Sequence, residues 1–250
     1  MMRFRALALA GLVAFPVSAA AQQQPTIQTP DQARQLPQAG FAVTPFVGVR
    51  VPFSTGDEFL FFGNEQVSST RVRREHGGSI AAGLEGEYRF AGPWSLVGTA
   101  SYSPAGNDAV TITQRTGQTD ELGTDGPDMY FGRLGVSLRL PEPSPDARRF
   151  RPGGFIVVAP AVVHMRPDGG EATSHPALNL GLQATAPIGR SRRLAFQLGI
   201  DDYVTFWNTD ALADNDVPAF SNLYNEPVRI DYDYATSNLL MIRLGASFRF

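Results

Sequence analysis

Apolar residues occupy every second position in eight separate segments of this chain, and these positions carry no charge. Alternate residues of a β-strand point to the same face of a sheet, so each segment predicts a strand with an apolar face. After residue 21, no segment shows the 3.6-residue period of an amphipathic helix. The chain is therefore predicted to be all-β. The eight segments are residues 43–51, 80–90, 94–102, 130–140, 155–165, 178–188, 194–200 and 240–250. Residues 155–165 are apolar at both parities, so the register of this strand stays open.

The intervening positions of these segments hold charged residues among glycine, serine, threonine and glutamine. Such two-faced strands fit two architectures. In a soluble barrel or sandwich the apolar face points inward, whereas in a membrane barrel it points outward to lipid. The alternation alone leaves both open. The charged positions that would line the lumen of a membrane barrel are Arg50, Glu85, Glu87, Arg89, Arg133, Arg139, Asp201, Arg243 and Arg249.

The N-terminus favours export from the cytoplasm. Arg3 and Arg5 precede an apolar run over residues 6–17, and small residues follow to Ala21. This pattern predicts a signal peptide over residues 1–21, cleaved after Ala21. A transmembrane helix is the weaker alternative, because the run is short and Pro16 interrupts it. Residues 22–40 are rich in Gln, Pro and Thr and predict a flexible periplasmic segment before a barrel over residues 41–250.

The spacing of the segments also favours a membrane barrel. Their lengths match a tilted crossing of the hydrocarbon layer. Connections at residues 91–93, 141–153 and 189–193 alternate with longer ones, as in outer-membrane barrels. Aromatic residues gather at segment ends, where amphipathic rings would sit at the headgroups. We predict one rim with Tyr88, Phe90, Trp94 and Phe250, and another with Tyr102, Tyr130 and Tyr234.

The last residues of the chain resemble a known family. Leu244, Ala246, Phe248 and Phe250 alternate up to a terminal phenylalanine, as in the C-terminal strand of bacterial outer-membrane proteins. The resemblance implies that these residues form the signal read by the barrel-assembly machinery. Residues 41–250 are similar to small barrels of the OmpA, OmpX and OmpW type. This implies an eight-stranded antiparallel up-and-down transmembrane β-barrel in the outer membrane of a Gram-negative-type bacterium.

Composition excludes several classes of protein. The chain has no cysteine, which rules out disulfides, thiol nucleophiles and cysteine zinc sites. Its net charge of −3 argues against a nucleic-acid partner that reads only phosphates. The acidic stretch Asp210, Asp214 and Asp216 lacks the regular spacing and glycine of a calcium loop. We therefore expect no metal and no cofactor, and a monomer in contact with membrane lipid.

The charged lumen positions lead to two functional hypotheses. An eight-stranded barrel leaves an interior that side chains can fill, and unpaired charges there would be costly. We therefore expect ion-paired networks, with Glu85, Arg133 and Arg243 near mid-depth, in a plugged barrel with a structural or surface-interaction role. The alternative is a narrow pore for small solutes. Six arginines against three acids would make such a pore prefer anions.

The long connections contain two further candidate sites. Arg71, Arg73 and Arg74 cluster in the first connection, and arginine forks suit the phosphates of lipopolysaccharide. Pairing with the acidic last connection is the favoured alternative. An outer-leaflet lipid hydrolase is a third hypothesis, using Ser174 with His164 or His175 and Glu171. A triad is defined by geometry rather than by sequence proximity, so no enzyme is expected.

Pro45 and Pro160 fall inside predicted strands. Proline lacks the N–H that a β-ladder needs, so each is expected to cause a bulge.

Overall fold

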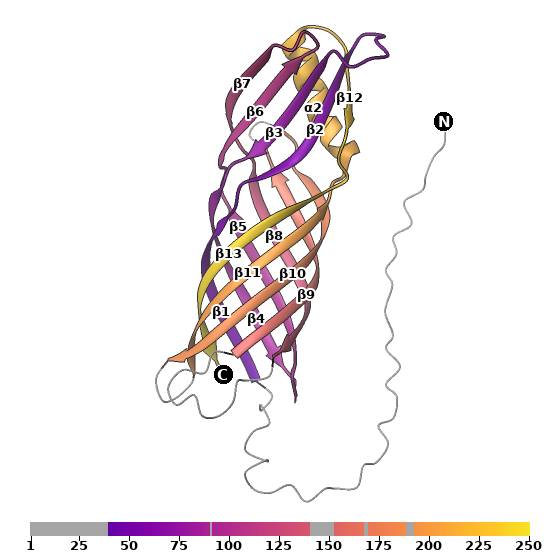
Figure 1. The fold of residues 1–250 in the computed structure, drawn as a ribbon. Helices are drawn as coiled ribbons and strands as arrows, with labels where there is room; N and C mark the ends of the chain where they lie inside the picture. Colours follow the sequence, from indigo (N-terminus) through magenta and orange to yellow (C-terminus); the bar gives the residue numbers. More distant parts are fainter. Residues whose placement is uncertain (1–39, 91, 141–152, 168–169, 189–192) are drawn as a thin grey trace, which may run out of the picture. The chain divides into compact units, whose positions relative to one another are not determined.

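The computed structural model describes residues 40–90, 92–140, 153–167, 170–188 and 193–250. In these residues, eight antiparallel strands form a closed barrel, each paired with the next barrel strand along the chain, and β1 closes on β13. The predicted eight-stranded fold is confirmed (Figure 1). The strands are β1 (Gly40–Arg50), β4 (Ser79–Arg89), β5 (Trp94–Ser103), β8 (Asp128–Arg139), β9 (Gly153–Arg166), β10 (Thr173–Ile188), β11 (Leu194–Phe206) and β13 (Thr236–Arg249).

Parts of the prediction fall outside these residues. The signal peptide, almost all of the segment 22–40, and most of the connections at 141–153 and 189–193 are not described. They stay predictions.

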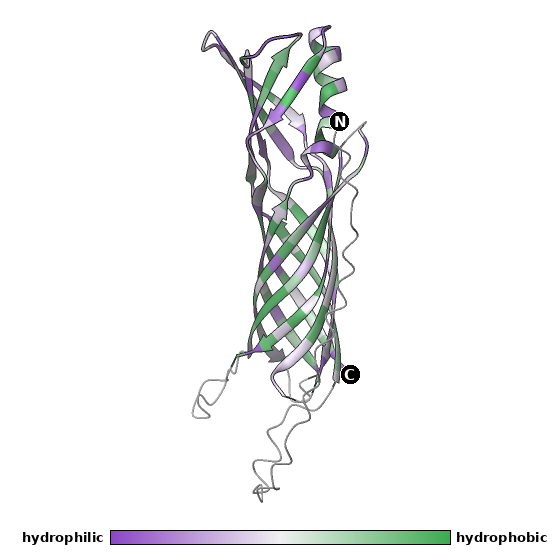
Figure 2. Ribbon diagram, turned by 90° about the vertical axis from the view of Figure 1, so that its right-hand side faces the viewer, coloured by the Kyte–Doolittle hydropathy of each residue, from purple (hydrophilic) through white to green (hydrophobic). Residues whose placement is uncertain are grey.

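The outer surface of the barrel is apolar. Among its large apolar side chains, Ile80 is 71% exposed, Leu134 is 61% exposed and Leu182 is 59% exposed. Figure 2 shows apolar residues recurring along the barrel strands. A continuous exposed apolar surface is unfavourable in water and is what a lipid-facing wall requires. The alternating stripes therefore point outward, as the membrane-barrel alternative predicts.

Aromatic rings pair near strand ends on this outer surface. The rings of Tyr88 and Phe90 lie 5.3 Å apart, and those of Tyr102 and Tyr130 lie 5.0 Å apart. Phe41 stacks on Phe250 at the end of the barrel where the chain finishes. The assignment of Tyr234 to a rim was wrong. Its ring packs against the apolar cluster that includes Trp207 and lies beyond the barrel strands, so Trp207 rather than lipid surrounds it.

Neither Pro45 nor Pro160 produces a bulge, so that prediction was wrong. The β1–β13 register is the same on both sides of Pro45, and the β8–β9 register is the same on both sides of Pro160. Each proline interrupts one ladder and pairs through the other, Pro45 with Leu84 and Pro160 with Leu178. A missing donor on one side is thus tolerated without an extra residue.

Three of the long connections fold beyond the end of the barrel where β1 finishes, opposite the C-terminus (Figure 1). They form a five-stranded antiparallel sheet in the order β12-β2-β3-β6-β7. The sequence predicted loops here, and that was wrong for these segments. The strands are β2 (Phe53–Phe62), β3 (Thr70–His76), β6 (Asn107–Gln114), β7 (Thr119–Asp125) and β12 (Val228–Tyr232).

The acidic last connection contains a helix, α2 (Thr209–Tyr224), which the period analysis did not find. The Asn208 side chain accepts a hydrogen bond from the Ala211 N–H, and Asn225 ends the helix with a left-handed conformation at φ 56°. Phe220 is its buried residue, which explains the weak period. None of the helices in the described ranges is long and apolar enough to cross a membrane.

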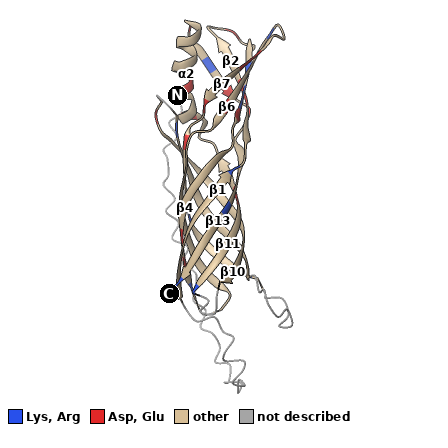
Figure 3. Ribbon diagram, turned by 90° about the vertical axis from the view of Figure 1, so that its left-hand side faces the viewer, with Lys and Arg blue, Asp and Glu red and all other residues tan. Residues whose placement is uncertain are grey.

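The sheet and α2 together form a unit that we call the cap. The cap has its own core, in which Leu60 and Val72 are fully buried and Phe220 and Ile230 join them. The apolar run at residues 59–62 contributes Leu60 to this core, so it stabilises the cap. Figure 3 shows acidic and basic residues along the cap strands and α2. A cap with a core can hold its side chains in fixed positions.

Apolar side chains are buried in the lumen next to the cap. Phe46, Phe131 and Tyr203 are almost fully buried there, and the rings of Phe131 and Tyr203 lie 5.0 Å apart. We call these residues and their buried neighbours the apolar layer. The expectation of an inward face made only of small and charged residues was therefore incomplete. The remaining barrel residues of the layer are Ala81, Met129, Val163, Met165, Ala177, Leu239 and Met241.

Candidate functional site

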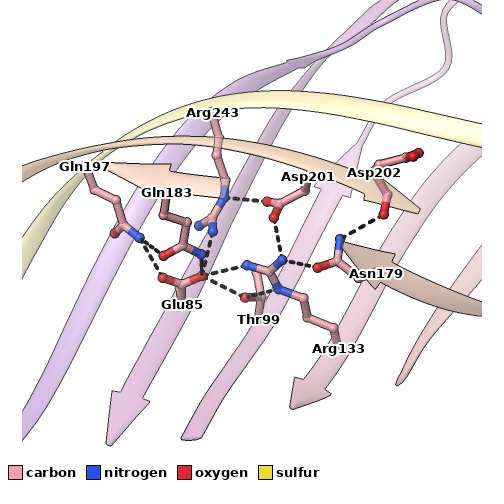
Figure 4. Close-up of polar contacts among 9 residues, drawn as sticks. All are labelled: Glu85, Thr99, Arg133, Asn179, Gln183, Gln197, Asp201, Asp202 and Arg243. Atoms are coloured by element: carbon pink, nitrogen blue, oxygen red, sulfur yellow. Dashed lines mark hydrogen bonds and ion pairs between the residues drawn. The ribbon is translucent and has the colours of Figure 1, made fainter. Parts of the chain in front are cut away.

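A buried polar network occupies the lumen at the centre of the barrel (Figure 4). Glu85 on β4 is 3% exposed and is its hub. Its Oε2 accepts hydrogen bonds from Arg133 Nη2 at 2.8 Å and from Arg243 Nη2 at 2.7 Å. Its Oε1 accepts a bond from Gln197 Nε2 at 2.8 Å. One carboxylate thus binds two guanidinium groups, which are stronger partners than neutral donors.

A second carboxylate completes the charge balance of the network. Asp201 on β11 is 1% exposed, and its Oδ2 lies 2.6 Å from Arg243 Nε. Its Oδ1 accepts a hydrogen bond from Arg133 Nη1. Two arginines and two carboxylates therefore alternate around a closed set of ion pairs. Such pairing offsets part of the large cost of removing four charges from water.

Neutral side chains satisfy other polar groups of the network. Thr99 Oγ1 lies 3.0 Å from Arg133 Nε, and Gln183 Nε2 donates to Glu85 Oε2 at 3.1 Å. Asn179 accepts a bond from Arg133 Nη1. With the four charged residues, these contacts join β4, β5, β8, β10, β11 and β13 across the lumen. We call these residues the lumen network: Glu85, Thr99, Arg133, Asn179, Gln183, Gln197, Asp201 and Arg243.

Two glycines leave the space that the network occupies. A Cβ at Gly181 would lie 2.5 Å from Asp201 Oδ1, and a Cβ at Gly199 would lie 2.8 Å from Arg243 Nε. Both distances are shorter than real contacts, so these positions exclude a side chain. The small residues of the inward face are therefore part of the site.

The structure places the other predicted lumen charges away from this centre. Glu87 and Arg89 pair at 2.9 Å on β4, closer to the end of the barrel where the chain finishes. Arg89 and Arg139 both lie over the ring of Phe155. Arg249 lies near the end of β13. At the opposite end of the barrel, the fully buried Arg50 donates to Ser103 at 3.3 Å.

The predicted assembly signal lies on the outer wall. Leu244 is 53% exposed, Phe248 is 46% exposed and Phe250 is 82% exposed. Ala246 lies on the same face of β13. These side chains are accessible from the membrane side, whereas Arg243, just before them, and Ser247, among them, are buried on the opposite face of β13.

The cap arginines separate into two groups. Arg71 and Arg73 share one carboxylate, Asp57 on β2, with Arg73 Nε 2.9 Å from its Oδ1. Burial alone would raise the pKa of Asp57, but the hydrogen bonds from the two arginines lower it overall. The side chains of Arg71 and Arg73 remain about half exposed, at 48% and 49%.

Arg74 on β3 faces the other way. Its Nε lies 3.0 Å from Glu58 Oε1, and its Nη2 lies 3.0 Å from Asp216 Oδ1 on α2. The favoured pairing with the acidic last connection thus holds for Arg74, whereas Arg71 and Arg73 pair within their own hairpin. Burial raises the pKa of Glu58, although Arg74 opposes the shift, and the two carboxylates raise the pKa of the Arg74 guanidinium against its desolvation.

The residues of the hydrolase hypothesis do not form one site. His164 Nδ1 lies 2.9 Å from Ser174 Oγ, and Ser174 is on the outer face of β10. His175 is fully buried on the inner face, where its Nδ1 accepts a hydrogen bond from the Asn208 N–H. The backbone of Glu171 bonds to the Asn215 side chain. The two histidines therefore lie on opposite sides of the barrel wall.

Sequence reasoning missed the neutral half of the lumen network. Asn179, Gln183 and Gln197 share the inward parity of Asp201, and so do Gly181 and Gly199. Their position opposite the apolar stripe was a signal that they face the charges. In the described residues, no group of three acidic or histidine side chains has the geometry of a metal site.

No family model matches this chain, and no curated protein matches its sequence. The solved structures that are similar to it include the following three. OprG, an outer membrane protein from Pseudomonas aeruginosa, shares 12% identity at a TM-score of 0.48, over 85% of this chain and 96% of that chain. Neisserial surface protein A shares 9% at 0.42, over 85% and 98%. Ail, the attachment invasion locus protein of Yersinia pestis, shares 10% at 0.37, over 85% and 100%.

Proposed function

We propose that this protein is an outer-membrane barrel with a plugged lumen, and that it acts through its cap at the cell surface. The observation that carries the proposal is the presence of buried side chains at two successive levels of the lumen. The apolar layer closes the end next to the cap, and the lumen network spans the centre. A solute would have to displace packed rings and then break four ion pairs.

The outer surface supports the location. The exposed apolar wall of the barrel suits lipid, and the paired tyrosines suit its interfaces. The accessible side chains of Leu244, Phe248 and Phe250 suit recognition by the barrel-assembly machinery. The cap offers a folded surface to external partners, including β7, an edge strand whose seven residues are all exposed.

Single-channel recording tests the plug. We expect the refolded mature protein, residues 22–250, to give no openings in a planar bilayer, because the side chains of the apolar layer and of the lumen network cross the lumen at two levels. A heat-dependent gel shift shows whether the same preparation is folded. Stable openings from folded protein would overturn the plug and support a narrow pore. In that case the excess of arginine in the lumen predicts preference for anions.

Arg71 and Arg73 support a second, smaller proposal, that the cap contacts lipopolysaccharide phosphates. Two half-exposed guanidinium groups share the single carboxylate of Asp57, so their positive charge is only partly neutralised. Planar guanidinium groups bind phosphate oxygens through two hydrogen bonds. Arg74 takes no part in this contact, because its guanidinium already pairs with the carboxylates of Glu58 and Asp216.

Changing Arg71 and Arg73 together to Gln is expected to reduce the lipopolysaccharide that purifies with the protein, as measured by its phosphate content. Arg229→Gln is the matched control, because Arg229 is 61% exposed on β12 of the same sheet. The control should retain wild-type lipid. Unchanged lipopolysaccharide in the double variant would eliminate this contact.

A further inference from the structure

A small, partly open chamber lies between the cap and the rim of the barrel. Its volume is about 110 Å³. Trp207 and Met165 come from the barrel strands and their ends, Tyr234 and Glu58 come from the last connection and β2, and Leu212 comes from α2. The lumen network and the arginine pair at Asp57 are not part of it. Neither the plug nor the lipopolysaccharide proposal gives it a role.

Negative charge exceeds positive charge in this chamber. Glu58 and Asp216 line it and share the single guanidinium of Arg74, and the exposed Asp125 adds a third carboxylate. His76 also lines it, but its Nδ1 lies 2.6 Å from the carboxylate of Asp108. The chamber is therefore short of positive charge. Glu58 is only 1% exposed, so water compensates it poorly.

Hydrogen bonds hold the carboxylates in place without neutralising them. The Tyr234 hydroxyl donates to Glu58 Oε1 at 3.3 Å, and the Tyr232 hydroxyl donates to Asp216 Oδ2 at 3.1 Å. The buried Thr55 also lines the chamber and is 6% exposed.

Aromatic rings form two walls of the same chamber. The rings of Trp207 and Tyr234 lie 6.4 Å apart at an interplanar angle of 87°, so they make a corner. Met165 and Leu212 add apolar surface. Aromatic corners beside carboxylates attract organic cations, because the ring faces carry negative potential and the apolar groups contact the methyl or methylene carbons. An inorganic cation would gain little from such walls.

The volume limits the size of the ligand. A dry cavity of about 150 Å³ holds a benzene molecule, so this chamber fits a ligand of about five non-hydrogen atoms. Tetramethylammonium and small alkylammonium ions have this size. From the charge deficit, the aromatic corner and the volume together, we propose that the chamber is a binding site for a small organic cation bearing an ammonium group.

Tetramethylammonium is the probe for this site. The chain has two tryptophans, and Trp94 is on the outer wall, so Trp94→Phe leaves Trp207 as the only indole reporter. Titration of the folded full-length mature protein in detergent is expected to give a saturable change in Trp207 fluorescence. tert-Butanol has the same number of non-hydrogen atoms and no charge. It should bind about ten-fold more weakly or not at all.

Removal of one carboxylate separates a charge-selective site from a simple apolar cavity. Glu58→Gln should weaken tetramethylammonium binding about ten-fold. Asp57→Asn is the matched control, since Asp57 is the adjacent residue of β2 and pairs with Arg71 and Arg73 outside the chamber. The affinity of the Asp57→Asn variant for tetramethylammonium should equal that of the parent protein. If Glu58→Gln does not fold by the gel-shift criterion, Asp216→Asn on α2 makes the same test.

Three results would overturn the inference. The first is no response to tetramethylammonium from folded protein. The second is equal binding of tert-butanol, which would make the chamber an unselective apolar cavity. The third is equal weakening by Glu58→Gln and Asp57→Asn, which would place the effect outside the chamber. None of these results bears on whether the lumen conducts, so the inference and the plug fail independently.

Discussion

Glu85→Gln is expected to lower the free energy of unfolding by about 3–5 kcal/mol, because it removes one partner from a buried set of ion pairs. Two guanidinium groups, Arg133 and Arg243, would then share the single carboxylate of Asp201. Their excess positive charge would lie inside a lumen where both side chains are almost unexposed. Urea unfolding in lipid vesicles, followed by tryptophan fluorescence, measures the change.

Glu87→Gln is the control for this variant. Glu87 lies two residues further along β4, toward the end of the barrel where the chain finishes, and its side chain is 15% exposed, so its loss should cost less. The double variant Glu85→Gln with Arg243→Gln restores a neutral network around Arg133 and Asp201. It should recover part of the lost stability, with a coupling of roughly 0.5–3 kcal/mol. Equal stability of Glu85→Gln and the wild type would show that the network does not hold the barrel together.

Leu134→Arg is expected to destabilise the membrane-inserted protein by about 2–4 kcal/mol if the residue lies near the midplane of the bilayer. Leu134 is 61% exposed on the outer wall and directly follows Arg133 of the lumen network on β8. An arginine there would have to place its guanidinium in hydrocarbon or distort the lipid. The same urea titration measures the effect.

Leu122→Arg gives the comparison in water. Leu122 is 50% exposed on β7 of the cap, so an arginine there should change the unfolding free energy little. A large difference between the two variants would therefore report the solvent that surrounds each position. Equal, small effects would contradict the assignment of the barrel wall to lipid.

The sequence alone predicts the barrel well because lipid imposes a simple rule on it. Outward positions within the hydrocarbon layer must be apolar, so residues such as Ile80, Leu134 and Leu182 recur with a period of two. That period identifies the eight strands and the faces of seven of them, whereas residues 155–165 are apolar at both parities and their face stayed open. It also places Glu85, Arg133 and Arg243 in the lumen. These residues alternate with the apolar positions, and a charged side chain is too costly to face hydrocarbon.

The interior and the cap follow no such rule. Inward positions accept large rings as well as charges, so parity alone does not distinguish Phe131 from Arg133, which lie two residues apart on β8. The cap strands are short and partly solvated, and their core depends on pairing between connections that are distant in the sequence. Helix α2 buries mainly Phe220, which leaves no period to detect. These features depend on three-dimensional packing.

The strand order of the cap sheet has a consequence for how the barrel unfolds. β1 and β13 are the first and last barrel strands, and the ladder between them closes the barrel. β2 directly follows β1, and β12 directly precedes β13, and these two strands also pair with each other in the cap. The Asp233 N–H bonds to the Asp57 carbonyl at 2.9 Å just beyond that ladder. The first and last barrel strands are thus joined by two ladders, one in the barrel wall and one in the cap. Separating β1 from β13 must break both ladders. The second ladder therefore raises the barrier to unfolding at the place where the barrel closes.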